Sequence, residues 1–252
     1  MIRFSHVSKS YGARRVLDDV SLAIPRGEFV ALVGQSGAGK TTLLKAVNRL
    51  TGIDAGKVEV SGRDEMAQSP SVLRRGIGYV FQGVGLFPHM SVAENIWLVP
   101  RLIGQPEAQR EARIAELLDL VALPPDVANR RPAQLSGGQA QRVGFARALA
   151  AGPSIMLMDE PFGALDPVTR GELGAAYRAL HERMGLTSLL VTHDMAEALL
   201  LADRGIVLGE GSILADQPPA ALIRQAGDGP AGTIIAAARG TAARLEALAR
   251  GR

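Results

Sequence analysis

The stretch that decides the fold is Gly34-Gln35-Ser36-Gly37-Ala38-Gly39-Lys40-Thr41-Thr42. It fits the pattern G-x-x-x-x-G-K-[ST], which binds phosphate groups when it follows a strand and begins a helix. The apolar run Phe29–Val33 before it has the length of a buried parallel strand, and residues 43–47 after it place apolar side chains at helical spacing. The sequence therefore predicts a phosphate-binding loop between a strand and a helix.

The residue types of this loop predict separate roles. Gly34, Gly37 and Gly39 allow consecutive backbone N–H groups to face one anion, and the helix that begins near Lys40 adds the positive end of its dipole. Lys40 is expected to neutralise the β and γ phosphates of a nucleotide, and the Thr41 hydroxyl to hold Mg²⁺. The structural alternative is a glycine-rich turn with a surface lysine, which the completeness of the motif disfavours.

Composition indicates a globular chain and excludes or disfavours several kinds of functional site. Its 252 residues, 47% of them hydrophobic and 21% charged, suffice for one domain with an inserted subdomain. It has no cysteine, which excludes disulfides and thiolate sites, and its four histidines are scattered singly, which disfavours a transition-metal site. The net charge of +3 is concentrated in residues 239–252, so the body is nearly neutral and a nucleic-acid groove is not expected.

Neither the start of the chain nor its longest uncharged stretch has the pattern of a membrane span. The first six residues lack the layout of a signal peptide, so no secretion is expected. The longest stretch without Asp, Glu, Lys or Arg, residues 76–93, is interrupted by glycines and Pro88 and does not fit a lipid-facing helix. Any membrane role is expected to depend on a partner.

Apolar patterns predict the other strands. Residues 2–7 and 16–22 are expected to form antiparallel strands that flank the strand of the phosphate loop. The continuous apolar runs 155–158 and 188–192 are typical of buried parallel strands, which present polar residues at their carboxyl ends. These patterns together predict an α/β fold.

The middle of the chain predicts a helical insertion. Ser91 and Glu94 have the spacing of a capping box, and Ile114, Leu117 and Leu118 lie on one stripe of a charged helix. We therefore expect an inserted helical subdomain over about residues 91–150. An Ala/Arg-rich helical tail is expected over residues 226–252. We expect this tail to be a solvent-exposed helix rather than a helix that contacts lipid.

Tyr11 precedes Gly12 at the end of the first predicted strand. It is either an aromatic platform for a nucleotide base or a turn tyrosine that covers the sheet edge. Its position alone does not decide between them.

Asp159 and Glu160 directly follow four apolar residues. After a phosphate loop, this pair predicts that Asp159 holds Mg²⁺ through a water and that Glu160 accepts a proton from the water that attacks the γ-phosphate. A pair of helix-capping acids is the structural alternative, and the position of the pair before Pro161 disfavours it.

The stretch Leu135-Ser136-Gly137-Gly138-Gln139 has two interpretations. Ser136 and Gln139 fit a capping box. Two glycines in the first helical positions weaken a helix unless an anion approaches the exposed N–H groups. We therefore interpret it as a second phosphate-binding surface, which two copies arranged head-to-tail could place against each other's phosphate loop.

A known family has these features in the same order. The chain resembles the nucleotide-binding subunit of ATP-binding cassette (ABC) transporters over about residues 1–225, through Tyr11, Gly34 to Thr42, Gln82, Leu135 to Gln139, Ile155 to Glu160, Ala164 to Asp166, and His193. The resemblance implies a P-loop NTPase fold of RecA-like type, with a parallel-sheet core, an antiparallel β subdomain and the inserted α-helical subdomain.

The resemblance also implies site roles for ATP and Mg²⁺. Glu160, His193 and Gln82 would be catalytic, with His193 contacting the γ-phosphate and Gln82 contacting Mg²⁺ or the attacking water and sensing the partner. Tyr11 would stack on adenine. The other ATP-binding residues would be those of the loop: Gly34, Gln35, Ser36, Gly37, Ala38, Gly39, Lys40, Thr41 and Thr42. The residues that bind Mg²⁺ would be Thr41, Gln82 and Asp159. A second copy of the chain would contribute Leu135, Ser136, Gly137, Gly138, Gln139 and Asp166 to the same site.

The implied partners are a second copy of the chain, membrane permease subunits that contact the stretch from Gly83 to Met90, and indirectly a solute-binding protein, with no nucleic acid. The protein would be peripheral at the cytoplasmic face of the cell membrane. An ordinary loop packed on the inserted helices is the structural alternative for that stretch.

A finer resemblance concerns the solute. Residues 47–50, 85–96 and 139–149 look like ATPases of importers for glycine betaine, choline and related osmoprotectants. Many of those carry a C-terminal regulatory module, and osmotic gating by such a module is not expected here. The alternatives are an importer ATPase for another small solute such as an amino acid, or a soluble cassette ATPase acting on nucleic acid or ribosomes. A non-catalytic interaction protein is disfavoured by intact Lys40, Asp159, Glu160 and His193.

Overall fold

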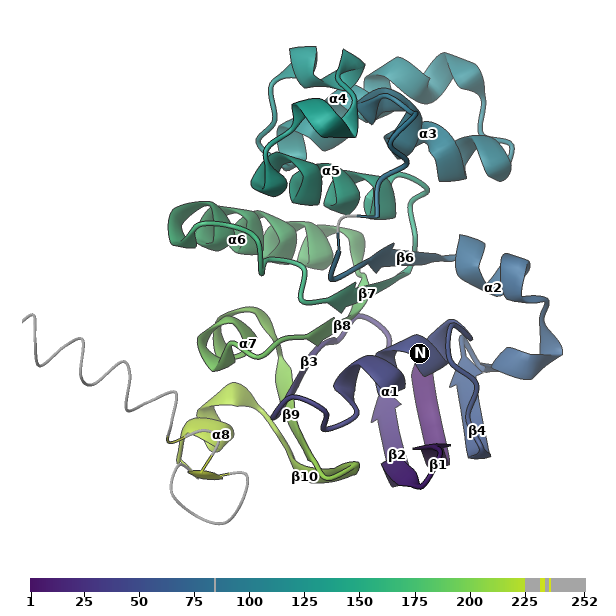
Figure 1. Cartoon of the computed structure of the whole chain (residues 1–252), viewed down its shortest axis with the longest axis vertical. Coiled ribbons are helices and arrows are strands. Elements are labelled where there is room, and N and C mark those ends of the chain that lie inside the picture. The colour runs from purple at the N-terminus through teal and green to yellow at the C-terminus, as the bar shows by residue number, and fades with distance from the viewer. Residues whose placement is uncertain (84, 225–231, 234–235, 237–252) are drawn as a thin grey trace, which may run out of the picture. The chain divides into compact units, whose positions relative to one another are not determined.

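The computed structural model describes residues 1–83, 85–224, 232, 233 and 236. Figure 1 shows the helices and strands of the chain. The described residues divide into two compact units: unit 1 contains residues 1–65 and the described residues from 189 onward, and unit 2 contains Met66–Ser188. Apart from positions 232, 233 and 236, the predicted helical tail lies outside the described residues.

An antiparallel sheet forms the first part of unit 1. Its strands lie in the order β2-β1-β4-β5 and every neighbouring pair is antiparallel. The bounds are β1 (Ile2–Tyr11), β2 (Arg14–Ile24), β4 (Ala55–Val60) and β5 (Arg63–Asp64). Alternation along β1 buries Ile2, Phe4 and Val7 and leaves the other face more open, as expected for an antiparallel sheet.

The prediction that β1 and β2 flank the strand of the phosphate loop is wrong. The two strands pair with each other through the turn between Tyr11 and Arg14, and β1 also pairs with β4. The physical reason is that a two-residue turn joins consecutive antiparallel strands directly. Alternating burial in β1 and β2 also suits a sheet with one covered face, whereas all five residues of the phosphate-loop strand are buried.

That strand, β3 (Phe29–Val33), belongs to a second group of strands in unit 1. Its neighbours are β8 (Thr187–Val191) and β9 (Arg204–Gly209), and it runs parallel to β9. The strand β10 (Ser212–Gln217) completes an antiparallel hairpin with β9. In its described part the unit also contains the helices α1 (Lys40–Val47), α7 (Met195–Leu201) and α8 (Pro219–Arg224).

Unit 2 contains a parallel pair of strands and five α-helices in its described part. The strands are β6 (Ile77–Val80) and β7 (Ile155–Asp159). The helices are α2 (Pro70–Arg75), α3 (Val92–Leu102), α4 (Arg110–Leu120), α5 (Gly137–Leu149) and α6 (Pro167–Met184). Short 3₁₀-helices occur at Glu107–Gln109, Pro125–Asn129 and Pro132–Gln134, and another, Glu65–Ala67, lies where the two units meet in the sequence.

The helices α3, α4 and α5 lie in the stretch predicted to be an inserted subdomain and pack against one another. The predicted capping box at the start of α3 is confirmed, because Ser91 and Glu94 each accept a backbone hydrogen bond from the other. The predicted apolar stripe of α4 is also confirmed, since Ile114, Leu117 and Leu118 are buried. Local patterns therefore placed these helices correctly.

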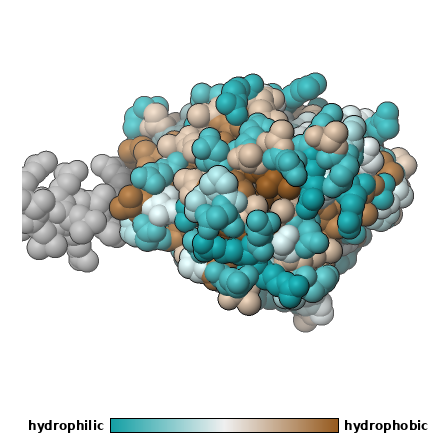
Figure 2. Space-filling view, turned by 90° about the horizontal axis from the view of Figure 1, so that it is seen from above, coloured by the Kyte–Doolittle hydropathy of each residue, from teal (hydrophilic) through white to brown (hydrophobic). Residues whose placement is uncertain are grey.

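The face of the protein drawn in Figure 2 mixes hydrophilic and apolar residues. Across residues 1–83 and 85–224, none of the helices has both the length and the apolar character needed to cross a membrane.

Glu65 is a buried carboxyl in unit 1. It is 2% exposed, and its Oε2 atom is buried without a hydrogen-bond partner. Burial raises the pKa of Glu65 to about 7, since desolvation outweighs the attraction of Arg49, and the neighbouring charge of Asp64 raises it further. Arg49 donates a long hydrogen bond of 3.5 Å to the backbone oxygen of Glu65.

The raised pKa predicts a pH-dependent stability. The folded protein keeps this proton up to about pH 7, whereas an unfolded glutamate loses it near the ordinary value of 4.5. The stability that the neutral carboxyl contributes is therefore complete below pH 4.5 and is lost as the pH rises through about 7. Thermal unfolding of Glu65→Gln at a series of pH values should show a smaller fall in Tm across this range than the wild type. The exposed Glu172→Gln is the control, and equal slopes for Glu65→Gln and the wild type would contradict the assignment.

Candidate functional site

The predicted phosphate loop lies between β3 and α1, as the sequence indicated. Gly34 has φ +149°, and a Cβ there would lie 2.1 Å from the backbone oxygen of Leu208. Gly39 has φ +102°, and a Cβ there would lie 2.5 Å from the backbone oxygen of Val16. No side chain fits at either position, so the conformation of the loop requires glycine.

Lys40 folds over the loop that precedes it. Its Nζ donates hydrogen bonds to the backbone oxygens of Gly34, at 2.8 Å, and Gln35, at 2.9 Å, and the residue is 8% exposed. Carbonyl dipoles compensate part of the cost of burying the charge. The ammonium group is therefore held at the loop, where an anionic ligand would meet it.

His193 lies beside the end of β3 that leads into the phosphate loop. The backbone N–H of Thr192 donates to the backbone oxygen of Leu32 at 3.2 Å, which fixes the turn between β8 and α7 next to the strand that leads into the phosphate loop. Asp194 caps α7 by accepting from the N–H of Ala196 at 2.9 Å. The side chain of His193 is exposed. Unit 1 thus brings the loop, Lys40 and the His193 turn to one place.

Tyr11 ends β1 and lies directly opposite Arg14 across the turn. The tyrosine is 52% exposed, and Lys9 Nζ lies 5.4 Å from its ring centroid. Such exposure leaves a ring surface on which a base could stack, which favours the platform over the edge-covering interpretation. The contact with adenine stays a prediction.

The predicted catalytic residues of unit 2 gather at the carboxyl ends of β6 and β7, which run parallel. Asp159 is the last residue of β7 and is 2% exposed. Gln82 follows β6, and its Nε2 donates to Glu160 Oε2 at 3.2 Å. Burial, and after it the charge of Asp159, raise the pKa of Tyr79. The structure therefore brings Gln82, Asp159 and Glu160 together within this unit.

The backbone of Glu160 is in the left-handed region, with φ +49°. For a residue other than glycine such a conformation costs about 1–3 kcal/mol and persists only when its surroundings hold it. Gln141 supplies that support: its Nε2 donates to the backbone oxygens of Glu160 and Pro161, and its Oε1 accepts from the N–H of Ala164 at 3.2 Å.

Gln141 was not among the predicted site residues. The available signal was a polar residue on an apolar stripe of α5, because Gln141 has helical spacing with Phe145 and both are buried. A buried amide is expected to be hydrogen-bonded, but the pattern alone does not identify its partners.

The stretch around Ser136 has the capping box that its pattern predicted. Ser136 Oγ accepts from Gln139 N at 3.2 Å, and Gln139 Oε1 accepts from Ser136 N at 3.0 Å. A Cβ on Gly137 would meet no atom within 4 Å. Packing therefore does not explain the glycine at this helix start, and close approach by a ligand stays a prediction.

Asp166 caps α6. Its Oδ1 accepts from Thr169 N at 3.0 Å and Val168 N at 3.1 Å, and the bonds from Thr169 hold the pKa of this carboxyl below its usual range. Its predicted place at a dimer seam stays a prediction.

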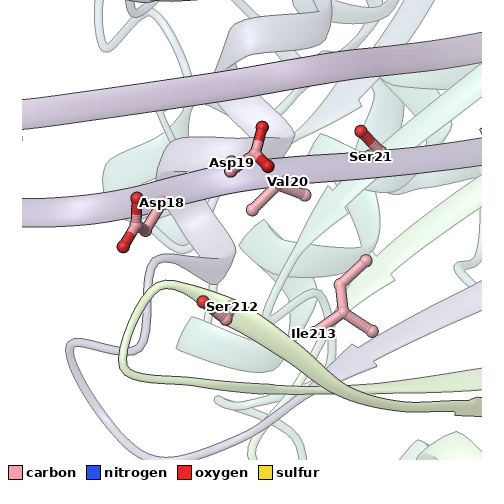
Figure 3. Close-up of a pocket in the computed structure, with 6 residues that line it drawn as sticks. All are labelled: Asp18, Asp19, Val20, Ser21, Ser212 and Ile213. Atoms are coloured by element: carbon pink, nitrogen blue, oxygen red, sulfur yellow. The ribbon is translucent and has the colours of Figure 1, made fainter.

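A separate hollow of about 440 Å³ lies in unit 1 between β2 and β10 (Figure 3). Its two carboxylates point away from each other. Asp18 Oδ1 lies 2.8 Å from Arg15 Nη1, and Asp19 Oδ1 lies 2.8 Å from His6 Nδ1, so both acids have partners. In the part of the chain that the structure describes, no group of three or more His, Asp or Glu residues could hold a metal ion.

A family model described as ABC transporter matches residues 17–163, more than half of the chain. The chain is 47% identical over 225 residues to the carnitine transport ATP-binding protein OpuCA of Listeria monocytogenes (strain 10403S), covering 89% of this chain and 57% of that protein. It is 47% identical over 223 residues to the glycine betaine uptake system ATP-binding protein YehX of Escherichia coli K12, covering 88% of this chain and 72% of that protein. The chain therefore spans less than two thirds of the carnitine relative.

A solved structure has the same fold. The dimeric post-hydrolysis state of the ATP-binding cassette MJ0796, bound to ADP and Pi, superposes with a TM-score of 0.80. The two sequences are 34% identical, and the match covers 87% of this chain and 99% of that one. The P-loop cassette fold expected from the sequence is confirmed.

Proposed function

Since the chain belongs to the ABC transporter family, we propose that it binds and hydrolyses ATP and thereby drives solute uptake through separate membrane subunits. The observation that carries the proposal is the hydrogen bond of 3.2 Å between Gln82 and Glu160 at the end of β7. This bond holds the carboxylate of Glu160 beside Asp159 at the strand end, which supports Glu160 as the general base.

Binding of the nucleotide rests on unit 1. The glycine loop would surround the phosphates, Lys40 would neutralise their charge, and His193 would contact the γ-phosphate. Thr41 and the buried carboxylate of Asp159 are hard oxygen donors that fit Mg²⁺, with Gln82 as a further ligand. Magnesium, when bound, would supply additional charge neutralisation at the phosphates.

The complete site would need a second copy of the chain. Residues Leu135 to Gln139 of one copy would face the phosphate loop of the other, with Asp166 at the seam. The unexplained glycine at position 137 supports this arrangement. The similar cassette MJ0796 is described as dimeric and bound to ADP and Pi, which also supports it.

The proposed solute is a quaternary amine of the osmoprotectant type. Support comes from two relatives at 47% identity that are named for carnitine transport and glycine betaine uptake. An importer for another small solute, such as an amino acid, is the alternative. These names describe transport proteins and do not favour a soluble cassette that acts on nucleic acid or ribosomes. A solute-binding protein would act indirectly, and the chain would sit at the cytoplasmic face of the membrane.

A groove in unit 2 is the proposed contact for the permease. It encloses about 350 Å³ and includes Gly85 and Phe87 from the stretch predicted to bind that partner. Phe81 and Phe87 line it and are 43% and 41% exposed. Arg147 donates to the backbone oxygen of Gly85 at 2.8 Å, so the loop is held in place. Exposed aromatic rings in a preformed groove are typical of a docking surface.

Replacing the proposed base tests the reaction. Glu160→Gln keeps the shape of the side chain but cannot accept a proton, so hydrolysis should fall by at least about 100-fold. ATP binding should persist, and ATP-bound dimers should accumulate on size-exclusion chromatography. The control is Glu172→Gln, an exposed change on α6. Undiminished hydrolysis in Glu160→Gln would remove this residue as the base.

Mixing two inactive variants tests the pairing in trans. Ser136→Arg should block the surface that one copy contributes to the partner's site but leaves its own phosphate loop intact. Lys40→Ala should disable the phosphate loop of the copy that carries it but leaves the surface around Ser136 intact. A heterodimer of the two keeps one intact composite site, so a one-to-one mixture should recover up to about a quarter of the wild-type hydrolysis. Each variant alone should be inactive. A mixture with no recovery would count against the composite site.

Crosslinking tests the permease contact. The chain has no cysteine, so Phe87→Cys introduces a single thiol into the groove. In membranes that contain the complete transporter, it should crosslink to a permease subunit. Met184→Cys is a matched control, because Met184 and Phe87 are both 41% exposed. Equal crosslinking from both positions, or none from Phe87→Cys, would contradict docking in this groove.

A further inference from the structure

Arg14 is a cation that the proposed function has not used. It is the first residue of β2, and its Nη2 donates to the backbone oxygen of Gly37, in the phosphate loop, at 3.2 Å. Within the described residues no carboxylate lies within ion-pair distance of it. Its neighbour Arg15 differs, because it pairs with Asp18 at 2.8 Å.

The register of the β1–β2 hairpin relates Arg14 to Tyr11. The two residues lie directly opposite each other, and opposite residues of an antiparallel pair project from the same face. Arg14 therefore starts on the face that carries the tyrosine ring and ends at the phosphate loop. It joins the two places where the ends of a nucleotide would bind.

A nucleotide would have to pass this side chain. With its base on Tyr11 and its β-phosphate in the loop, the part between them is the ribose and the α-phosphate. Arg14 spans that same interval, and a guanidinium has five N–H donors that suit phosphate oxygens. One of them is used on Gly37.

We propose that Arg14 is a nucleotide-binding residue whose guanidinium contacts the α-phosphate. This assignment rests on the proposed function, because it needs a nucleotide with its base on Tyr11. The competing role is purely structural: Arg14 would hold the loop in shape through its bond to Gly37. A direct contact depends on the oxygens of the α-phosphate, whereas a structural role does not.

Binding of ADP provides the first measurement. By calorimetry, Arg14→Gln should weaken ADP and ATP alike by about tenfold, the effect of losing one charge-assisted hydrogen bond. Arg14→Lys should recover part of the loss, because it keeps the charge. Arg15→Gln is the matched control and should bind like the wild type. Melting temperatures should show that all three variants fold, since both arginines are exposed.

The deciding measurement uses ADP with sulfur in place of one α-phosphate oxygen, as two separate diastereomers. Sulfur accepts hydrogen bonds poorly, so a direct contact with one α-phosphate oxygen weakens only the diastereomer that carries sulfur at that position. The ratio of the affinities of the two diastereomers then depends on Arg14. The ratio should change by at least about threefold in Arg14→Gln and stay unchanged in Arg15→Gln.

The outcomes separate the two proposals. An unchanged ratio in Arg14→Gln, with normal nucleotide binding by the wild type, would overturn the assignment of Arg14 alone and leave the structural role. A wild type that binds neither ADP nor ATP would overturn the proposed function and this assignment with it.

Discussion

The arrangement of unit 1 depends on the close approach of backbone atoms around Val16. Its carbonyl oxygen would lie 2.5 Å from a Cβ on Gly39 and 2.9 Å from a Cβ on Gly211. The phosphate loop, β2 and the β9–β10 turn therefore meet at a point where no side chain fits. The same contact brings the start of β2 to the loop, which is why Arg14 reaches Gly37.

Local signals predicted the elements better than their partners. The phosphate loop and the capping boxes at Ser91 and Ser136 occur where the sequence placed them, because backbone geometry and caps act over a few residues. The prediction of the strands beside β3 was wrong, because the alternation of apolar and polar residues shows which face of a strand is covered but not which strand lies beside it. Gln141 and Arg14 were missed for the same reason: their partners, around Glu160 and at Gly37, are distant in sequence.

The cap at Ser136 and its proposed role toward a nucleotide are compatible. In the capping box the hydroxyl oxygen accepts a hydrogen bond from Gln139 N. A serine hydroxyl also has one donor, which the cap does not require. The structural interpretation of the stretch explains Ser136 and Gln139 but does not explain Gly137, which the proposed approach of a ligand would account for. The two interpretations that the sequence set against each other therefore apply to different atoms.

One helix connects that surface with the proposed base. The helix α5 begins directly after Ser136 and carries Gln141, which holds the left-handed turn at Glu160. Because a hydrogen-bonded helix moves as a unit over so few residues, a displacement of its first turn by a partner's nucleotide would also move the amide of Gln141. The strained backbone of Glu160 would respond, since its conformation depends on that support. In the proposed dimer, engagement of a second copy would therefore be linked to placement of the carboxylate through α5 and the hydrogen bonds of Gln141, which would give a physical reason for hydrolysis to depend on pairing.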